Sequence, residues 1–250
     1  MYHELEVEGR PPSQNDPGYL RYVVREHEFR EQMEWLQSAA VRGISVSEAL
    51  TGGAAGGVVI TFDDGCKTDL SVAAPILRKL NFGATFYITV GFLGRPGYLD
   101  ASQLRELSDA EFEIGCHSMT HPYLSDLDHL QLHREVVEAK SRLEEIIDRP
   151  VHHFSCPGGR WSPAVSATAR QAGYRSVTTS RIAVNRADSD PFHLARLAIT
   201  RALTLQAFQD LCQGRGLWRR QLRSTIQSKS QQLFGNTLYD RLRNAMLRKG

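Results

Sequence analysis

The sequence has few cysteines, no long apolar run and no strong net charge. Only four cysteines occur in 250 residues and none form a CxxC pair, which is too few to staple a small secreted fold. No apolar stretch approaches the roughly 20 residues that span a membrane, and residues 1–19 lack the pattern of a signal peptide. These absences predict reduced thiols, a soluble chain and a cytoplasmic location.

Glycine and proline are also modest in number, at 20 and 10, which excludes a collagen-like or low-complexity chain. Hydrophobic residues make up 41% and charged residues 23%, as in ordinary globular proteins. The net charge of +2 hides an asymmetry, because residues 211–250 hold nine basic residues and one acidic residue. The composition therefore predicts a folded domain followed by a basic segment.

The hydrophobic periodicity alternates between strand and helix. Strands are predicted at 58–62, 84–90, 112–116, 152–155, 174–178 and 194–199, and helices at 26–40, 69–80, 101–108, 128–147 and 163–172. This alternation indicates a parallel α/β architecture, either a barrel or an open sheet. In both, the chemistry lies at the carboxyl ends of the strands.

Two predicted strand ends carry groups that can bind a metal ion. Asp63 and Asp64 follow the first strand, and His117 and His121 follow the third. Taken alone, the two aspartates would be part of an ordinary Asp-Gly turn, and the two histidines would be surface residues. Together, one carboxylate and two imidazoles form a ligand set that leaves positions open on a divalent ion, and the second carboxylate is placed to act as a base. The reaction class that this predicts is metal-assisted hydrolysis of an amide or ester.

The predicted strand at 152–155 is followed by the turn Pro157-Gly158-Gly159. Such a turn exposes backbone N–H groups and lets a substrate approach the main chain closely. It suits an oxyanion site.

The order of the motifs TFDDG, HSMTH and FSCPGG resembles that of the polysaccharide deacetylases of carbohydrate esterase family 4. The resemblance covers residues 1–205 and includes Met1-Tyr2-His3 and residues 83–88, which are similar to strands of that family. It implies a distorted (β/α) barrel with fewer than eight complete repeats over residues 1–205, and the charge pattern adds a basic helical extension over 206–250. It also implies a hydrolase that removes N-acetyl, rather than O-acetyl, groups from a sugar unit of a polysaccharide or its lipid-linked precursor.

The resemblance also implies roles for individual residues. Asp63 would be the general base, and the metal ligands would be Asp64, His117 and His121. The ion would be zinc, with cobalt, nickel or manganese as alternatives. Ser118 and Thr120 would support the loop that carries the two histidines. Pro157 and Gly158 would line the pocket for the acetyl group, and the Gly158 N–H would face the oxyanion.

The sequence departs from the family pattern in three ways. Ser155 stands where the common third motif has an arginine, as in the branch with F-x-x-P-x-G, and Arg196 is the residue expected to orient Asp63 instead. Residues 197–199 contain no histidine where the family's late Leu-x-His motif would supply the proton donor for the leaving amine, and no Asp-x-x-Asp-Trp signature follows the third motif. The general acid is therefore unassigned, with His193 standing either as a substitute or as a surface histidine.

Cys66, Cys116 and Cys156 each adjoin a motif. Packing at the strand ends is the preferred interpretation, with a redox or second metal role as the alternative.

The segment 214–250 interleaves basic and apolar residues. It is expected either to pack on the barrel or to lie on an anionic membrane, and no nucleic-acid motif accompanies its charge. Two alternatives to the glycan deacetylase stay open: a hydrolase of other linear or cyclic amides, and a catalytically weak glycan-binding or assembly protein.

Overall fold

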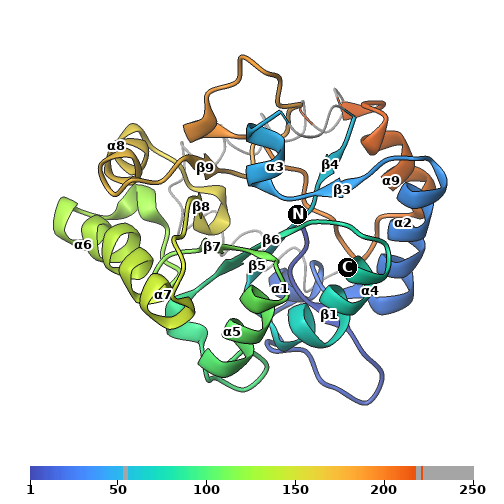
Figure 1. Cartoon of the computed structure of the whole chain (residues 1–250), viewed down its shortest axis with the longest axis horizontal. Coiled ribbons are helices and arrows are strands. Elements are labelled where there is room, and N and C mark those ends of the chain that lie inside the picture. Colours follow the sequence, from blue (N-terminus) through green and yellow to red (C-terminus); the bar gives the residue numbers. More distant parts are fainter. Residues whose placement is uncertain (53–55, 218–220, 222–250) are drawn as a thin grey trace.

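The computed structural model describes residues 1–52, 56–217 and 221, and its centre is a five-stranded parallel sheet. The strand order is β5 (Thr61–Asp64), β6 (Thr85–Ile88), β7 (Glu113–Cys116), β8 (His153–Ser155) and β9 (Ser176–Thr178). The intervening helices are α4 (Ala74–Lys79), α5 (Ala101–Asp109), α6 (His129–His133), α7 (Ala139–Ile147) and α8 (Pro163–Gln171). Figure 1 shows the strands at the centre and the helices around them.

The sheet curls and is closed through the N-terminus. Tyr2 forms a parallel bridge to Phe62 at one edge, and Leu194 forms one to Thr178 at the other. The Met1 amine donates to the Leu197 carbonyl at 2.9 Å, and the Ile199 N–H donates to the Met1 carbonyl at 2.9 Å. The distorted barrel with fewer than eight complete repeats is therefore confirmed.

Two short parallel pairs flank the main sheet. The first joins β1 (Leu5–Glu6) to β2 (Val24–Arg25), and the second joins β3 (Gly43–Ile44) to β4 (Val58–Val59). The short helices α1 (Pro17–Leu20) and α3 (Val46–Leu50) lie between these strands in sequence, and α2 (Glu26–Ser38) follows β2.

Side-chain alternation along β5 and β6 separates the packing core from the polar barrel interior. Phe62 stacks on Phe86 with ring centroids 4.8 Å apart, and Tyr2 and Phe29 of α2 pack around Phe62. Burying one such phenylalanine stabilises the fold by about 2–3 kcal/mol. Because neighbouring residues on a strand point to opposite faces, Asp63 then points into the barrel.

Two predicted helices contain π-helical turns. The predicted helix 128–147 begins where Asp128 and Gln131 form a capping box, and it is interrupted by η4 (Arg134–Glu138) before α7. The predicted helix 69–80 begins with the π turn η1 (Asp69–Ala73) and continues as α4. Both predictions placed the helix correctly but missed the irregular turn.

The prediction of a strand at 194–199 is wrong. Only Leu194 forms a bridge, and the rest of the segment has no regular structure. The reason is that its amides bond to different segments: the Leu194 N–H donates to the Val177 carbonyl of β9, whereas the Ile199 N–H donates to the Met1 carbonyl. No continuous ladder to one neighbour can form.

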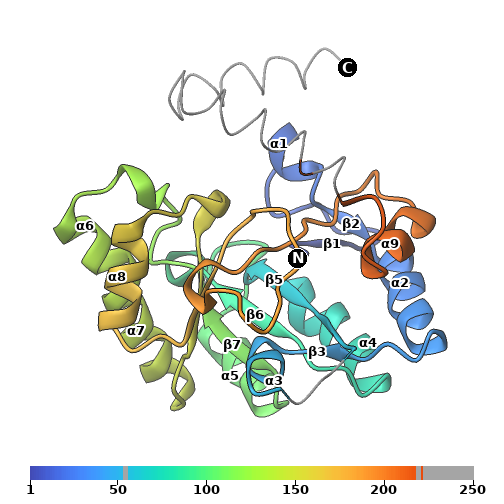
Figure 2. The ribbon, with the colours of Figure 1, turned by 90° about the horizontal axis from the view of Figure 1, so that it is seen from above.

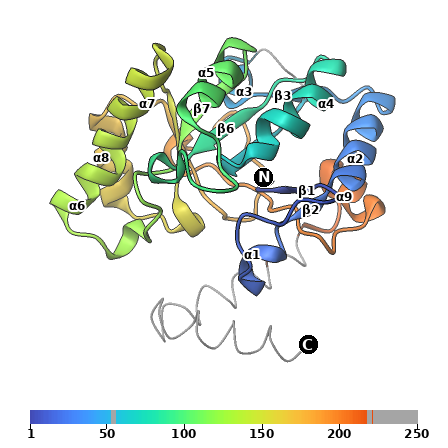
Figure 3. The same cartoon turned by 90° about the horizontal axis from the view of Figure 1, so that it is seen from below.

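The helix α9 (Leu205–Cys212) packs against α2, as Figures 2 and 3 show. Phe208 meets Trp35 edge to face at 6.0 Å, and Phe208, Leu211 and Leu217 are buried in the same core as the barrel. Most of the predicted amphipathic extension, residues 218–220 and 222–250, lies outside the described residues. Within the described ranges, no helix has the length and apolar character needed to cross a membrane.

Candidate metal centre

The carboxyl ends of β5 and β7 bring three predicted metal ligands together. His117 Nε2 lies 3.6 Å from Asp64 Oδ1, and His121 Nε2 lies 3.4 Å from the same oxygen. One ligand atom from each residue falls within 4.8 Å of the others, and within the described residues this is the one such cluster of metal-binding side chains.

Unusual backbone conformations build this cluster. Asp64 at the end of β5 has a φ of 83°. In the histidine loop, residues 118–121, Ser118 and His121 have φ values of 70° and 66°. This left-handed region is disfavoured for residues other than glycine, and it recurs where surrounding bonds hold a functional loop. Ser118 Oγ accepts a hydrogen bond from the His121 N–H at 2.9 Å, so the predicted support of the loop by Ser118 is present.

His117 is oriented by the strand beside it. Its Nδ1 lies 2.9 Å from the Ser155 carbonyl oxygen. A carbonyl can only accept, so Nδ1 carries the proton and the Nε2 lone pair faces the aspartates. Burial, together with His121, lowers the pKa of His117 from 6.5 to about 4, although Asp63 and Asp64 oppose this change. The imidazole is therefore neutral at neutral pH, as a metal ligand must be.

The residues present fit a divalent ion. Asp64 Oδ1 is buried and has no hydrogen-bond partner among the described residues, which is costly unless a cation meets it. Ligands bound at about 2.0–2.1 Å to a tetrahedral ion lie about 3.3–3.5 Å from one another. The spacings of 3.4 and 3.6 Å around Asp64 Oδ1 match that arrangement.

Asp63 lies beside the cluster in a buried ion pair with Arg196. Arg196 Nη1 and Nη2 donate to the two Asp63 oxygens at 2.7 and 2.8 Å, and Nη2 also donates to Ser155 Oγ at 2.7 Å. Burial alone would raise the pKa of Asp63, but the charge and hydrogen bonds of Arg196 outweigh it and hold that pKa well below 3.8. The contact between Arg196 and Asp63 expected from the sequence is therefore present, and Ser155, in the place of the usual arginine, bridges the two side chains.

Pro157 and Gly158 lie in the short turn η5 (Pro157–Gly159), which Cys156 separates from β8. Gly158 has φ of 59°, and a Cβ at this position would stand 2.8 Å from Cε1 of Tyr123. The turn thus requires glycine at the rim of the barrel where Ser155 already contacts His117 and Asp63.

His3 is a further residue at this site, and the sequence motifs assign it no role. The bridge between Tyr2 and Phe62 places His3 on the same face as Asp63, inside the barrel. Burial lowers the pKa of His3, while the charges of Asp64 and Asp63 raise it, and its Nδ1 is buried without a partner among the described residues. The resemblance of Met1-Tyr2-His3 to a strand of the deacetylase family placed this segment in the barrel, but it did not give the register that sets His3 beside Asp63.

His193, the substitute acid considered from sequence, stacks on Trp161 with centroids 4.0 Å apart. Its pKa is lowered by burial and by Arg181, while Asp190 raises it, and neither aspartate of the site contributes. His193 therefore behaves as a packed rim residue.

The three cysteines next to the motifs are buried and free. Burial raises the pKa of Cys116 and of Cys156 to about 12, so both are thiols rather than thiolates at neutral pH. This supports the packing interpretation.

A parallel α/β barrel with two histidines and two aspartates at its carboxyl face is the arrangement of a hydrolase site that could hold a metal ion. The family model for polysaccharide deacetylase matches residues 53–177, which is half of the chain. The chain belongs to the polysaccharide deacetylase family, and the predicted enzyme class, a polysaccharide deacetylase, is confirmed.

Two relatives and one solved structure illustrate the similarity. A protein of Bacillus subtilis described as a putative polysaccharide deacetylase is 27% identical over 192 residues, covering 74% of this chain and 68% of that protein. The peptidoglycan-N-acetylglucosamine deacetylase of Bacillus cereus is 35% identical over 49% of this chain and 56% of its own length. The fold is similar to that of the Streptococcus pyogenes deacetylase PplD, solved in complex with acetate, with a TM-score of 0.74, 21% identity and coverage of 84% and 94% of the two chains.

Proposed function

We propose that the protein is a divalent-metal-dependent deacetylase that hydrolyses the N-acetyl group of a sugar unit in a glycan. The observation that carries this proposal is the convergence of Asp64, His117 and His121 within 4.8 Å, with Asp63 Oδ2 3.7 Å from His117 Nε2. The Bacillus cereus relative is named for an N-acetylglucosamine substrate, which supports an N-acetyl rather than an O-acetyl group.

Asp64, His117 and His121 are the residues that would hold the ion, for which zinc is our first choice. A divalent ion there would polarise the acetyl carbonyl and make water acidic enough to attack it at neutral pH. Asp63, kept ionised by Arg196, is placed to accept the proton of the attacking water.

The turn after β8 supplies the surroundings of the acetyl group. Pro157 is buried and forms a wall, while Gly158 is exposed at the rim. We assign the Gly158 N–H as a donor to the oxyanion, and a donor of this kind contributes about 10²–10³ in rate.

His3 is assigned as the proton donor to the leaving amine. The family's late histidine is absent from 197–199, but the hydrogen bonds between Met1 and this same segment bring His3 to the adjacent position in the barrel. The charges of Asp63 and Asp64 act on His3, whereas neither contributes at His193.

Two alternatives share parts of this site. A hydrolase of other amides would use the same groups, and a glycan-binding protein would have no need of an ionised Asp63. The buried pair of Asp63 with Arg196 therefore favours catalysis.

The test is acetate release from N-acetylglucosamine oligomers by protein loaded with zinc, cobalt, nickel or manganese. We expect turnover that a chelator abolishes and that metal restores. Metal-loaded protein that releases no acetate from any acetylated glycan would instead support the binding protein, and release from non-glycan amides alone would support the other hydrolase.

A further inference from the structure

Glu135 is a buried carboxylate outside the proposed ligand set. It lies in the π turn η4 between α6 and α7 and is only 5% exposed. In the described part of the chain, no lysine, arginine or histidine forms an ion pair with it. A buried carboxylate without a cation is unfavourable unless hydrogen bonds compensate it.

The compensating bonds all come from the loop that joins the two histidine ligands. Glu135 Oε2 accepts from the Met119 N–H at 2.9 Å and from the Thr120 N–H at 2.8 Å. Glu135 Oε1 accepts from Thr120 Oγ1 at 2.7 Å. One side chain thus ties the middle of the loop to the helix behind it.

This tie acts on a loop that needs support. Ser118 and His121, on either side of the tied residues, both have left-handed backbones. That conformation brings His121 Nε2 to 3.4 Å from Asp64 Oδ1, whereas His117 is already held by the Ser155 carbonyl. His121 is therefore the ligand whose position depends on the loop.

We propose that Glu135 is a positioning residue for the metal centre, which fixes the 118–121 loop so that His121 can share an ion with Asp64 and His117. The inference rests on the metal dependence proposed above and extends it to a residue that touches neither ion nor substrate. π turns are frequent at functional sites, and η4 carries Glu135. Groups that support metal ligands typically change metal affinity by about 10–100-fold when they are replaced.

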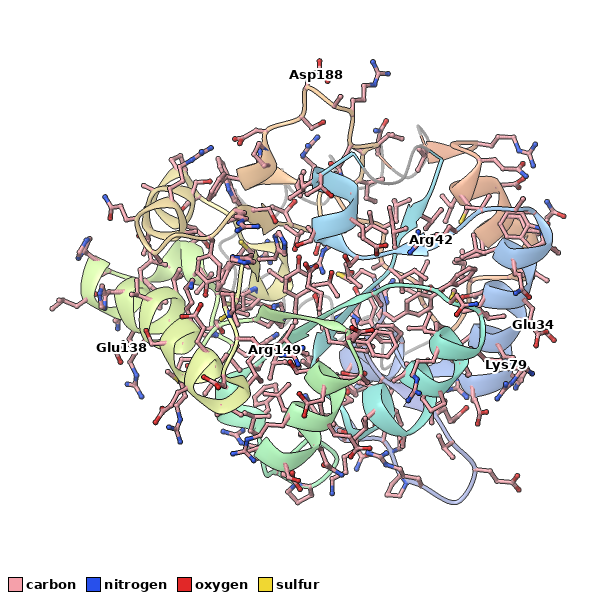
Figure 4. The ribbon with its side chains drawn as sticks, in the orientation of Figure 1. Glu34, Arg42, Lys79, Glu138, Arg149 and Asp188 are labelled. Atoms are coloured by element: carbon pink, nitrogen blue, oxygen red, sulfur yellow. The ribbon has the colours of Figure 1, made fainter. Side chains whose placement is uncertain are left out.

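The variant Glu135→Gln tests this role with almost no change in volume. A glutamine has one acceptor oxygen in place of two, and its amide would face loop N–H donors. The control is Glu138→Gln, because Glu138 lies in the same π turn but has a side chain 58% exposed, pointing outward in Figure 4, with only a 3.8 Å contact to His133.

Zinc affinity is measured by competition with a chromophoric chelator, cobalt coordination by its visible absorption spectrum, and folding of the metal-free proteins by circular dichroism. For Glu135→Gln we expect zinc binding about 10–100-fold weaker than in the parent, an altered cobalt spectrum, and a kcat restored to within a few-fold by saturating metal. We expect Glu138→Gln to match the parent in all three.

A folded Glu135→Gln protein with the parent's zinc affinity and cobalt spectrum would overturn the inference. If Glu135→Gln does not fold, Thr120→Val serves instead, because it removes only the hydrogen bond to Glu135 Oε1. A Thr120→Val protein that binds zinc as tightly as the parent would also overturn the inference. A parent protein that binds no divalent ion would refute the metal dependence itself, whereas equal binding by parent and variant refutes only the role of Glu135.

Discussion

Replacing Arg196 by methionine isolates the energetic role of the buried pair at the centre of the site. Arg196 and Asp63 have side chains 7% and 3% exposed, so the change leaves a carboxylate without its cation in the barrel interior. Breaking such a pair from one side costs about 3–5 kcal/mol. In a protein of this size that loss lowers the Tm by about 6–20 °C.

The loss of stability in Arg196→Met should depend on pH in a definite direction. In the parent, the pKa of Asp63 lies below its ordinary value of 3.8, so its contribution to stability is present above about pH 4 and is lost as the pH falls through the folded-state value. Without Arg196, burial dominates and raises the pKa of Asp63, so the folded variant binds the extra proton. The Tm difference between parent and variant should therefore be larger at pH 7.5 than at pH 5.

The assay is thermal unfolding of the metal-free proteins in a chelator, at both pH values. Arg201→Met is the matched control, because Arg201 pairs with Glu6 at 2.8 Å but both side chains are 36% exposed. Exposed pairs contribute about 0–1 kcal/mol. An Arg196→Met protein that loses no more stability than Arg201→Met, or loses more at pH 5 than at pH 7.5, refutes the reasoning.

Other predictions concern the proposed chemistry and the C-terminal segment. Asp63→Asn should lower turnover by about 10²–10⁴-fold while zinc still binds, and His117→Ala should lose both, as measured by acetate release and metal content; retained turnover in the first variant removes the base assignment. His3→Ala should slow hydrolysis of an N-acetyl sugar by about 10²-fold but hardly affect an aryl acetate, whose leaving group needs no proton, so equal losses on both substrates argue against a general acid. If the basic segment lies on an anionic membrane, deletion of residues 218–250 should weaken sedimentation with anionic liposomes and leave turnover of soluble oligomers unchanged, and unchanged sedimentation would contradict this alternative.

Local patterns in the sequence were enough to place the candidate ligands at one face of the sheet, and the family resemblance then chose Asp64 over Asp63 as the ligand. Strand periodicity located β5 and β7, and the rule that parallel strands end at one face predicted that the two aspartates and His117 lie close together. The resemblance to the deacetylase family added Arg196 as the partner of Asp63, and the structure places them in contact.

Local patterns failed where the chain closes the barrel. The segment 194–199 has the alternation of a strand, yet its amides bond to different neighbours and it forms no ladder. The π turns η1 and η4 were also missed, because one extra residue in a helical turn leaves almost no trace in hydrophobic periodicity.

The sequence by itself determined the alternation of strands and helices from β5 to β9 and the strand ends that carry Asp63, Asp64, His117 and His121. Those features depend on residues close together in the chain, which periodicity records. Only the tertiary structure decided that His3 lies beside Asp63 and that Glu135 holds the histidine loop. These contacts depend on register across the barrel and on the path of α6 and η4, which no short stretch of sequence encodes.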